Sequence, residues 1–64
     1  MNKEYFYNMG VKDGNKAIGG PKSYEDALAL KAKNISKKYG LENAQAYKDG
    51  LLSVIIPYKK GKNR

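Results

Sequence analysis

The chain has 64 residues, of which thirteen are Lys or Arg and six are Asp or Glu, giving a net charge of +7. It contains neither Cys nor His, which excludes disulfides, thiolate metal sites and the commonest general base of enzymes. The six carboxylates are scattered along the chain. We therefore expect one small basic domain that is not an enzyme and holds no cofactor and no metal.

The sequence also argues against a membrane protein. Its longest apolar stretch, residues 51–56, is interrupted by Ser53 and is far shorter than the roughly 20 residues that span a bilayer. Residues 1–8 contain no apolar core of signal-peptide length. We expect a cytoplasmic protein, which agrees with the absence of Cys.

The first segment with helical periodicity covers residues 3–18. Its apolar and small residues recur at three- and four-residue spacing, which places them on one face of a helix. They are Phe6, Tyr7, Gly10, Val11, Gly14, Ala17 and Ile18. Glycines on this face would let another element approach the backbone closely. A hairpin with its turn at residues 12–15 is an alternative, because Asp-Gly is a strong turn signal.

The second segment follows a break at residues 19–21, Gly-Gly-Pro. We expect Ser23 to cap a helix that runs from Tyr24 to Tyr39, with Gly40 ending it. Within this helix the apolar residues form a narrow stripe. They are Tyr24, Leu28, Ala32, Ile35 and Tyr39.

The third segment begins near Glu42, and its apolar residues stay in one helical phase through Gly50. We expect one helix that ends before Pro57. The alternative is a short helix capped by Gly50 and then a strand over residues 51–56, which are rich in β-branched side chains.

The fold class predicted from these segments is a compact all-α domain of three helices over residues 1–57, followed by a disordered basic tail over residues 58–64. The alternative is an α+β fold with an N-terminal hairpin and a C-terminal strand. The expected core residues share the apolar faces of the three helices. They are Phe6, Tyr7, Val11, Ile18, Tyr24, Leu28, Ala32, Ile35, Tyr39, Tyr47, Leu51, Val54 and Ile55.

Two local patterns resemble known proteins. The turn at residues 38–41 resembles the middle of a helix-turn-helix, but Asp49 lies where that motif usually buries an aliphatic residue, so an ordinary corner between helices is the alternative. The Tyr-x-x-Gly pattern at residues 7–10 and 47–50 resembles ribosome modulation factor, a small basic ribosome-binding protein. The glycine spacing differs from that family and its aromatic-rich second helix is missing here, so we do not assign the chain to it.

The leading functional hypothesis is a small accessory protein that binds nucleic acid or the ribosome through electrostatic phosphate contacts. Four of the last six residues are cationic, and Tyr58 beside them could stack on a base. The predicted nucleic-acid-binding residues combine the tail with the end of the second helix. They are Tyr58, Lys59, Lys60, Lys62, Arg64, Lys33, Lys37 and Lys38.

The second hypothesis is a small regulator or inhibitor that binds an acidic surface of another protein. Leu30 shares the outer face of the second helix with Lys33 and Lys37, which would form a mixed apolar and cationic contact patch. The composition, rich in Lys, Tyr and Asn, suits an AT-rich genome such as that of many phages, so such a regulator could be phage-encoded.

Overall fold

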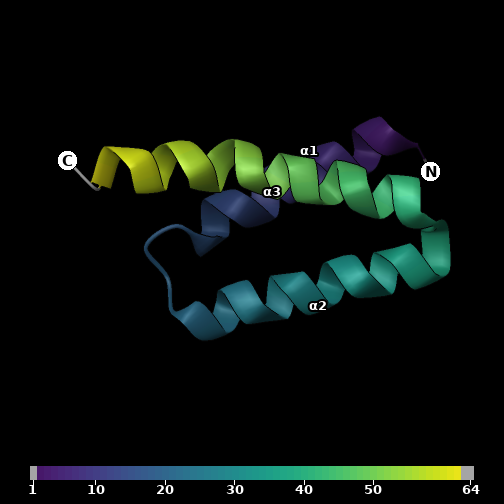
Figure 1. The fold of residues 1–64 in the computed structure, drawn as a ribbon, viewed down its shortest axis with the longest axis horizontal. Helices are drawn as coiled ribbons and strands as arrows, with labels where there is room; N and C mark the ends of the chain where they lie inside the picture. Colours follow the sequence, from purple (N-terminus) through teal and green to yellow (C-terminus); the bar gives the residue numbers. More distant parts are fainter. Residues whose placement is uncertain (1, 63–64) are drawn as a thin grey trace.

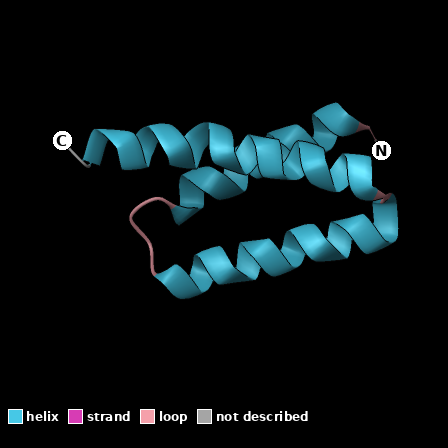
Figure 2. Cartoon of the chain, viewed as in Figure 1, coloured by secondary structure: helices cyan, strands magenta, loops and turns pink. Residues whose placement is uncertain are grey.

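The structure is a computed structural model that describes residues 2–62, without the side chain of Lys62. Three helices make up this part of the chain: α1 (Lys3–Ala17), α2 (Lys22–Tyr39) and α3 (Leu41–Lys62). Residues 2–62 contain no strand (Figure 2). The all-α prediction is confirmed, and the alternatives with an N-terminal hairpin or a C-terminal strand are wrong.

Helix α3 is the central element of the fold, because it packs against both α1 and α2 while those two touch each other little. Figure 1 shows α1 behind α3 and α2 running alongside α3 in the opposite direction. The Cα atoms extend over 37 × 21 × 14 Å. One side of α3 is therefore covered by α1, and a second side is shared with α2.

Helices α1 and α3 cross in direct backbone contact at two glycines. A Cβ built at Gly10 would collide with the carbonyl oxygen of Tyr47, and one built at Gly50 would collide with the carbonyl oxygen of Tyr7. The two collisions are equivalent, since each glycine faces the tyrosine three residues before the other. The Tyr-x-x-Gly pattern thus marks the crossing point of the two helices.

The starts of α1 and α2 are capped differently. Asn2 caps α1, its side-chain oxygen accepting from the backbone N–H of Tyr5 at 2.9 Å. The expected Ser23 cap of α2 is wrong, because α2 begins at Lys22 after Pro21, which supplies no side-chain cap. Pro is suited to a helix start, where its missing N–H leaves no intrahelical bond unmade.

A single residue separates α2 from α3. Gly40 has a φ of 100°, a conformation that L side chains rarely adopt, and its N–H donates to the carbonyl of Ser36 at 3.1 Å. The predicted stop at Gly40 is confirmed. The short connection places α2 and α3 side by side.

Helix α3 continues past Pro57, so the expected end before that residue is wrong. Residues 58–62 are helical rather than disordered, and residues 63–64 lie outside the described residues. Pro57 lacks the N–H that a helix interior uses. Contacts beyond it hold the last turns near the start of α2: the amine of Lys59 lies 3.8 Å from the carboxylate of Glu25. A Cβ built at Gly19 would lie 3.8 Å from the hydroxyl of Tyr58.

The buried core lies where the three helices meet. Its members are Phe6, Ala17, Leu28, Ala32, Ile35, Ala44, Tyr47 and Leu51. Of the expected core residues, Tyr7 and Tyr39 are wrong, since they are 39% and 43% exposed. The ring of Tyr39 still contacts Phe6, with ring centroids 5.2 Å apart. Val11, Ile18, Tyr24, Val54 and Ile55 are only half-buried.

Candidate functional site

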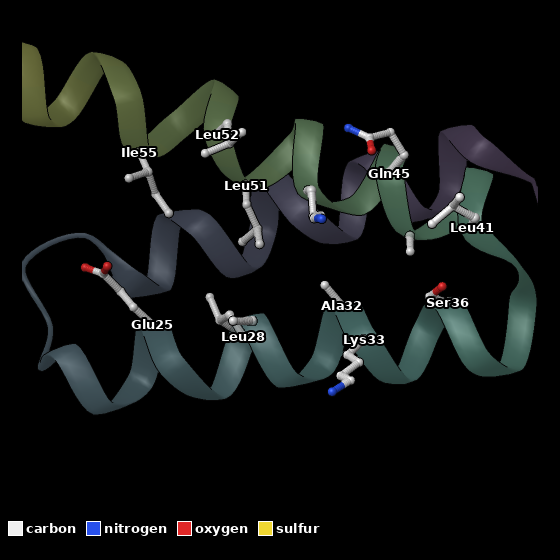
Figure 3. Close-up of a pocket in the computed structure, with 13 residues that line it drawn as sticks. Glu25, Leu28, Ala32, Lys33, Ser36, Leu41, Gln45, Leu51, Leu52 and Ile55 are labelled. Carbon is white, nitrogen blue, oxygen red and sulfur yellow. The ribbon is translucent and has the colours of Figure 1, made fainter.

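A groove of about 480 Å³ runs between α2 and α3 (Figure 3). Residues from these two helices alone line it: Glu25, Leu28, Ala29, Ala32, Lys33, Ser36, Leu41, Ala44, Gln45, Lys48, Leu51, Leu52 and Ile55. Its floor is formed by buried core residues such as Leu28, Ala32 and Leu51. The groove is therefore an opening onto the core rather than a surface dimple.

Large apolar side chains on α3 stand exposed along this groove. Leu41 is 73% exposed and Leu52 is 48% exposed, while Ile55 beside them is half-buried. Single exposed leucines are ordinary, but exposed leucines that continue into an apolar groove mark a contact surface. In the sequence, the adjacent apolar pairs Leu51-Leu52 and Ile55-Ile56 make the apolar face of this helix wider than packing against one neighbouring helix requires.

Two lysines flank the apolar surface, one on each wall. Lys33 lies on α2 and Lys48 on α3, and no described carboxylate lies within ion-pair distance of either amine. Glu25, at the other end of the groove, has its charge balanced by Lys59 at 3.8 Å. The groove is thus apolar with a net cationic margin.

The predicted partner-binding patch overlaps this groove only at Lys33. Leu30 is 59% exposed, as expected for a contact residue, but neither it nor Lys37 lines the groove. Leu30 therefore lies apart from the apolar groove. This separation makes it possible to test the two surfaces independently.

The predicted nucleic-acid-binding residues do not form one cluster. Lys33, Lys37 and Lys38 lie in the C-terminal half of α2, whereas Lys59 lies beside Glu25 near its start. Because α2 rises about 1.5 Å per residue, these positions are separated by about 12–20 Å along the helix. Lys60 is exposed on the last turns of α3, the side chain of Lys62 is not described, and Arg64 lies outside the described residues.

A buried polar cluster joins all three helices. The carboxylate of Asp13 on α1 accepts from the amine of Lys31 on α2 and from the hydroxyl of Tyr47 on α3, both at 2.7 Å. Burial raises the pKa of Asp13, but the two hydrogen bonds and the positive charge of Lys31 outweigh it and bring the pKa below its ordinary value. Burial, and then the hydrogen bond to Asp13, raise the pKa of Tyr47 well above its ordinary value.

This cluster fits a structural role better than a catalytic one. Asp13 is 7% exposed and Tyr47 is fully buried, so the carboxylate and the hydroxyl are shielded from solvent, whereas the side chain of Lys31 is 44% exposed. Every buried polar side-chain atom within residues 2–61 has a hydrogen-bond partner. We did not predict the cluster, because its members are 18 and 34 residues apart in sequence.

The turn at Gly40 has the geometry of a helical hairpin. Helices α2 and α3 lie alongside one another (Figure 1), whereas the helices of a helix-turn-helix cross at about 90–120°. At the start of α3, where a recognition helix would begin, two polar side chains bond within the chain: Asn43 donates to the carbonyl of Tyr39 at 2.8 Å, and Gln45 to Asp49 at 3.3 Å. These features argue against a helix-turn-helix, and the side-by-side arrangement is that of a hairpin rather than a corner between crossing helices.

Within the described residues, no group of three metal-ligating side chains is brought together. No helix in residues 2–62 has both the length and the apolar character needed to cross a membrane.

Comparisons with family models, with curated proteins and with solved structures found no match to this chain.

Proposed function

We propose that this protein is a small accessory or inhibitory protein that binds an acidic partner protein through the groove between α2 and α3. The observation that supports this is the apolar groove between α2 and α3. Leu41 and Leu52 are exposed along its α3 wall, and each wall carries a lysine without an ion-pair partner. Burying apolar area supplies affinity, and complementary charge supplies rate and specificity.

The charge of the chain itself argues for an acidic partner and against self-association. A second copy also carries +7 and would bring Lys33 and Lys48 against further cations. Like charges across an interface cost several kcal/mol, about as much as a few buried leucines contribute. An acidic surface reverses the sign of this contribution.

Affinity purification with three proteins tests the proposal: the wild type, Leu52→Glu in the groove and Leu30→Glu outside it. Both variants place Glu, a good helix former, at an exposed helical position, so both should fold. We expect an acidic protein that is enriched with the wild type and Leu30→Glu and is lost with Leu52→Glu. Loss with Leu30→Glu instead would move the contact to the outer face of α2.

Nucleic-acid or ribosome binding is a second candidate, favoured by the excess of lysines without a nearby carboxylate. Within residues 2–61 the ion pairs engage Lys3, Lys31 and Lys59, and other lysines, such as Lys12 and Lys60, have no such partner. Phosphate contacts need mobile cations rather than an apolar groove.

The salt dependence of binding to labelled duplex DNA and structured RNA tests this candidate. Each lost phosphate contact should flatten the logarithmic salt slope by about 0.9 on duplex DNA. Changing Lys59 and Lys60 to Gln should therefore flatten it by about 2, with Lys12 and Lys16 changed to Gln as the charge-matched control. Equal slopes for both double variants would show that the attraction is generic.

A further inference from the structure

We infer that the segment of the partner that fills the groove is an acidic amphipathic α-helix of about three turns. This inference rests on the proposed function and adds the secondary structure, the length and the side-chain pattern of the bound segment. It follows from the hydrogen-bonding state of the groove walls, from their side-chain sizes and from their charges.

The walls of the groove offer a bound backbone few regularly spaced groups to hydrogen-bond, since eight of the thirteen lining side chains are apolar. Both walls are α-helices whose backbone groups are already bonded within the helix, and most lining side chains are apolar. An extended segment laid there would bury unpaired N–H and C=O groups at a cost of about 1–3 kcal/mol each. A helix satisfies its own backbone, so it is the form of chain that this groove accepts.

Small side chains predominate on the α2 wall and large ones on the α3 wall, which sets the pattern of the occupant. Beside Leu28, α2 presents Ala29, Ala32 and Ser36, spaced by three and four, whereas α3 presents one small residue, Ala44, among Leu41, Leu51, Leu52 and Ile55. A helix packs its ridges into the grooves of its neighbour at an interaxial distance of 8–10 Å. Large apolar residues at the same three- and four-residue spacing would therefore fit over the small residues of α2.

The length of the groove limits the length of the bound segment. On α2 the lining residues extend from Glu25 to Ser36, which is about 16 Å at 1.5 Å per residue. Eleven residues of a partner helix cover that distance in about three turns. On α3 the lining residues extend from Leu41 to Ile55, about 21 Å, so three turns is the length over which an occupant contacts both walls.

The positive charges give the third requirement. Lys33 and Lys48 come from opposite walls, so an occupant would need carboxylates on both sides of its apolar stripe. Glu25, which lines the groove near the start of α2, already has its negative charge balanced by Lys59. The expected segment thus has Leu, Ile, Phe or Met on one face and Asp or Glu on its flanks.

Three synthetic peptides of fourteen residues test the inference by fluorescence anisotropy. The first carries four leucines at three- and four-residue spacing, glutamates on the flanks and a hydrocarbon staple that holds it helical. The second has the same composition with the leucines moved off a common face. The third replaces each glutamate of the first by lysine. Each is titrated with the wild type, Leu52→Glu and Leu30→Glu, after circular dichroism has confirmed that all three proteins are folded.

We expect the first peptide to bind the wild type at least about tenfold more tightly than the other two, because only it meets the apolar and the charge requirements together. Leu52→Glu should weaken that binding at least about tenfold, and Leu30→Glu should leave it unchanged. Both results together support a helix in the groove.

Other results overturn the inference in distinguishable ways. If the first two peptides bind equally and both depend on Leu52, the groove takes acidic apolar chains that lack a common apolar face, so the proposed function stands and the inference of an amphipathic helix fails. If the first peptide binds independently of Leu52, or does not bind at all up to about 1 mM, a range that covers even weak affinities, the inference is wrong. Dimerisation of the wild type that Leu52→Glu abolishes would place a second copy in the groove and contradict both.

Discussion

Asp13 is the residue on which the three helices converge. Its buried carboxylate accepts from Lys31 on one helix and from Tyr47 on another, both at 2.7 Å, and the amine of Lys31 lies 5.6 Å from the centre of the Tyr47 ring. A buried carboxylate without partners would be strongly unfavourable. The cluster therefore favours the one arrangement of helices that keeps all its hydrogen bonds.

Replacing Tyr47 by Phe removes one of these hydrogen bonds and keeps the buried ring. Because hydrogen bonds to charged groups contribute more than neutral ones, we expect a loss of about 1.5–3 kcal/mol in the free energy of unfolding. Urea denaturation followed by circular dichroism measures it. Tyr5→Phe is the control, since that side chain is 47% exposed and should show almost no change. A neutral Tyr47→Phe would mean that Asp13 does not depend on this hydroxyl.

The same carboxylate predicts an acid-dependent stability. The pKa of Asp13 is lower in the folded than in the unfolded chain, so its contribution is present above the unfolded value of about 3.9 and is lost as pH falls below it. The stability difference between the wild type and Asp13→Asn should therefore be largest near neutral pH and shrink below about pH 4. A difference that stays constant between pH 7 and pH 3 would contradict the assignment.

Sequence reasoning could place Tyr47 in the core but not pair it with Asp13. The helical phase of α3 put Tyr47 on its apolar face, and the structure buries it fully. Asp13 follows Lys12 within a possible Asp-Gly turn and had the pattern of a surface charge. Its partners become visible only when α1, α2 and α3 are packed together. Lys31 and Tyr47 lie 18 and 34 positions away from Asp13 in the sequence, and no local periodicity relates residues so far apart.

At the scale of the elements, the crossing of α1 and α3 depends on the absence of two side chains. The atoms that a Cβ at Gly10 or Gly50 would meet belong to the backbone of the opposing helix, which cannot rotate away as a side chain can. Gly14 extends the contact more loosely, with Leu51 and Val54 at 3.2 Å from its built Cβ. The close approach brings the cluster around Asp13 together.

Gly10→Ala and Gly50→Ala should each destabilise the domain, although Ala is about 1 kcal/mol better than Gly in an isolated helix. Separating two packed helices costs about 1–3 kcal/mol or more, so we expect a net loss in thermal denaturation. Gly61→Ala is the matched control: it is helical with nothing within 4 Å, and should be neutral or slightly stabilising. If all three variants behaved alike, the backbone contact would not limit the packing.

The elements themselves were largely predictable, and their exceptions have physical reasons. Three amphipathic segments and the stop at Gly40 follow from local spacing and from glycine's tolerance of positive φ. The continuation of α3 through Pro57 does not, because it accompanies contacts of Tyr58 with Gly19 and of Lys59 with Glu25. The glycines of α1 signalled a close approach, but only the fold identifies α3 as the partner.

In the molecule as a whole, the groove exists because no helix of residues 2–62 covers the open side of α2 and α3. A 64-residue chain buries only about 60% of its unfolded surface, so part of the core remains accessible. Helix α1 covers one side of α3, and the side shared with α2 stays open at Leu41 and Leu52. The sequence supplied the apolar residues of this face but not their exposure, since burial depends on which helix covers which.

We propose that a partner binds at the groove between α2 and α3 rather than at the cationic end of α3. Amide chemical-shift mapping of the ¹⁵N-labelled protein tests it most directly, with the stapled acidic peptide and a short DNA duplex titrated separately. We predict saturable shifts along the groove for the peptide, centred on Ala32, Lys48 and Leu52, and only weak, salt-sensitive shifts for the duplex. Saturable shifts confined to residues 58–62 with the duplex, and none along the groove with the peptide, would contradict the account.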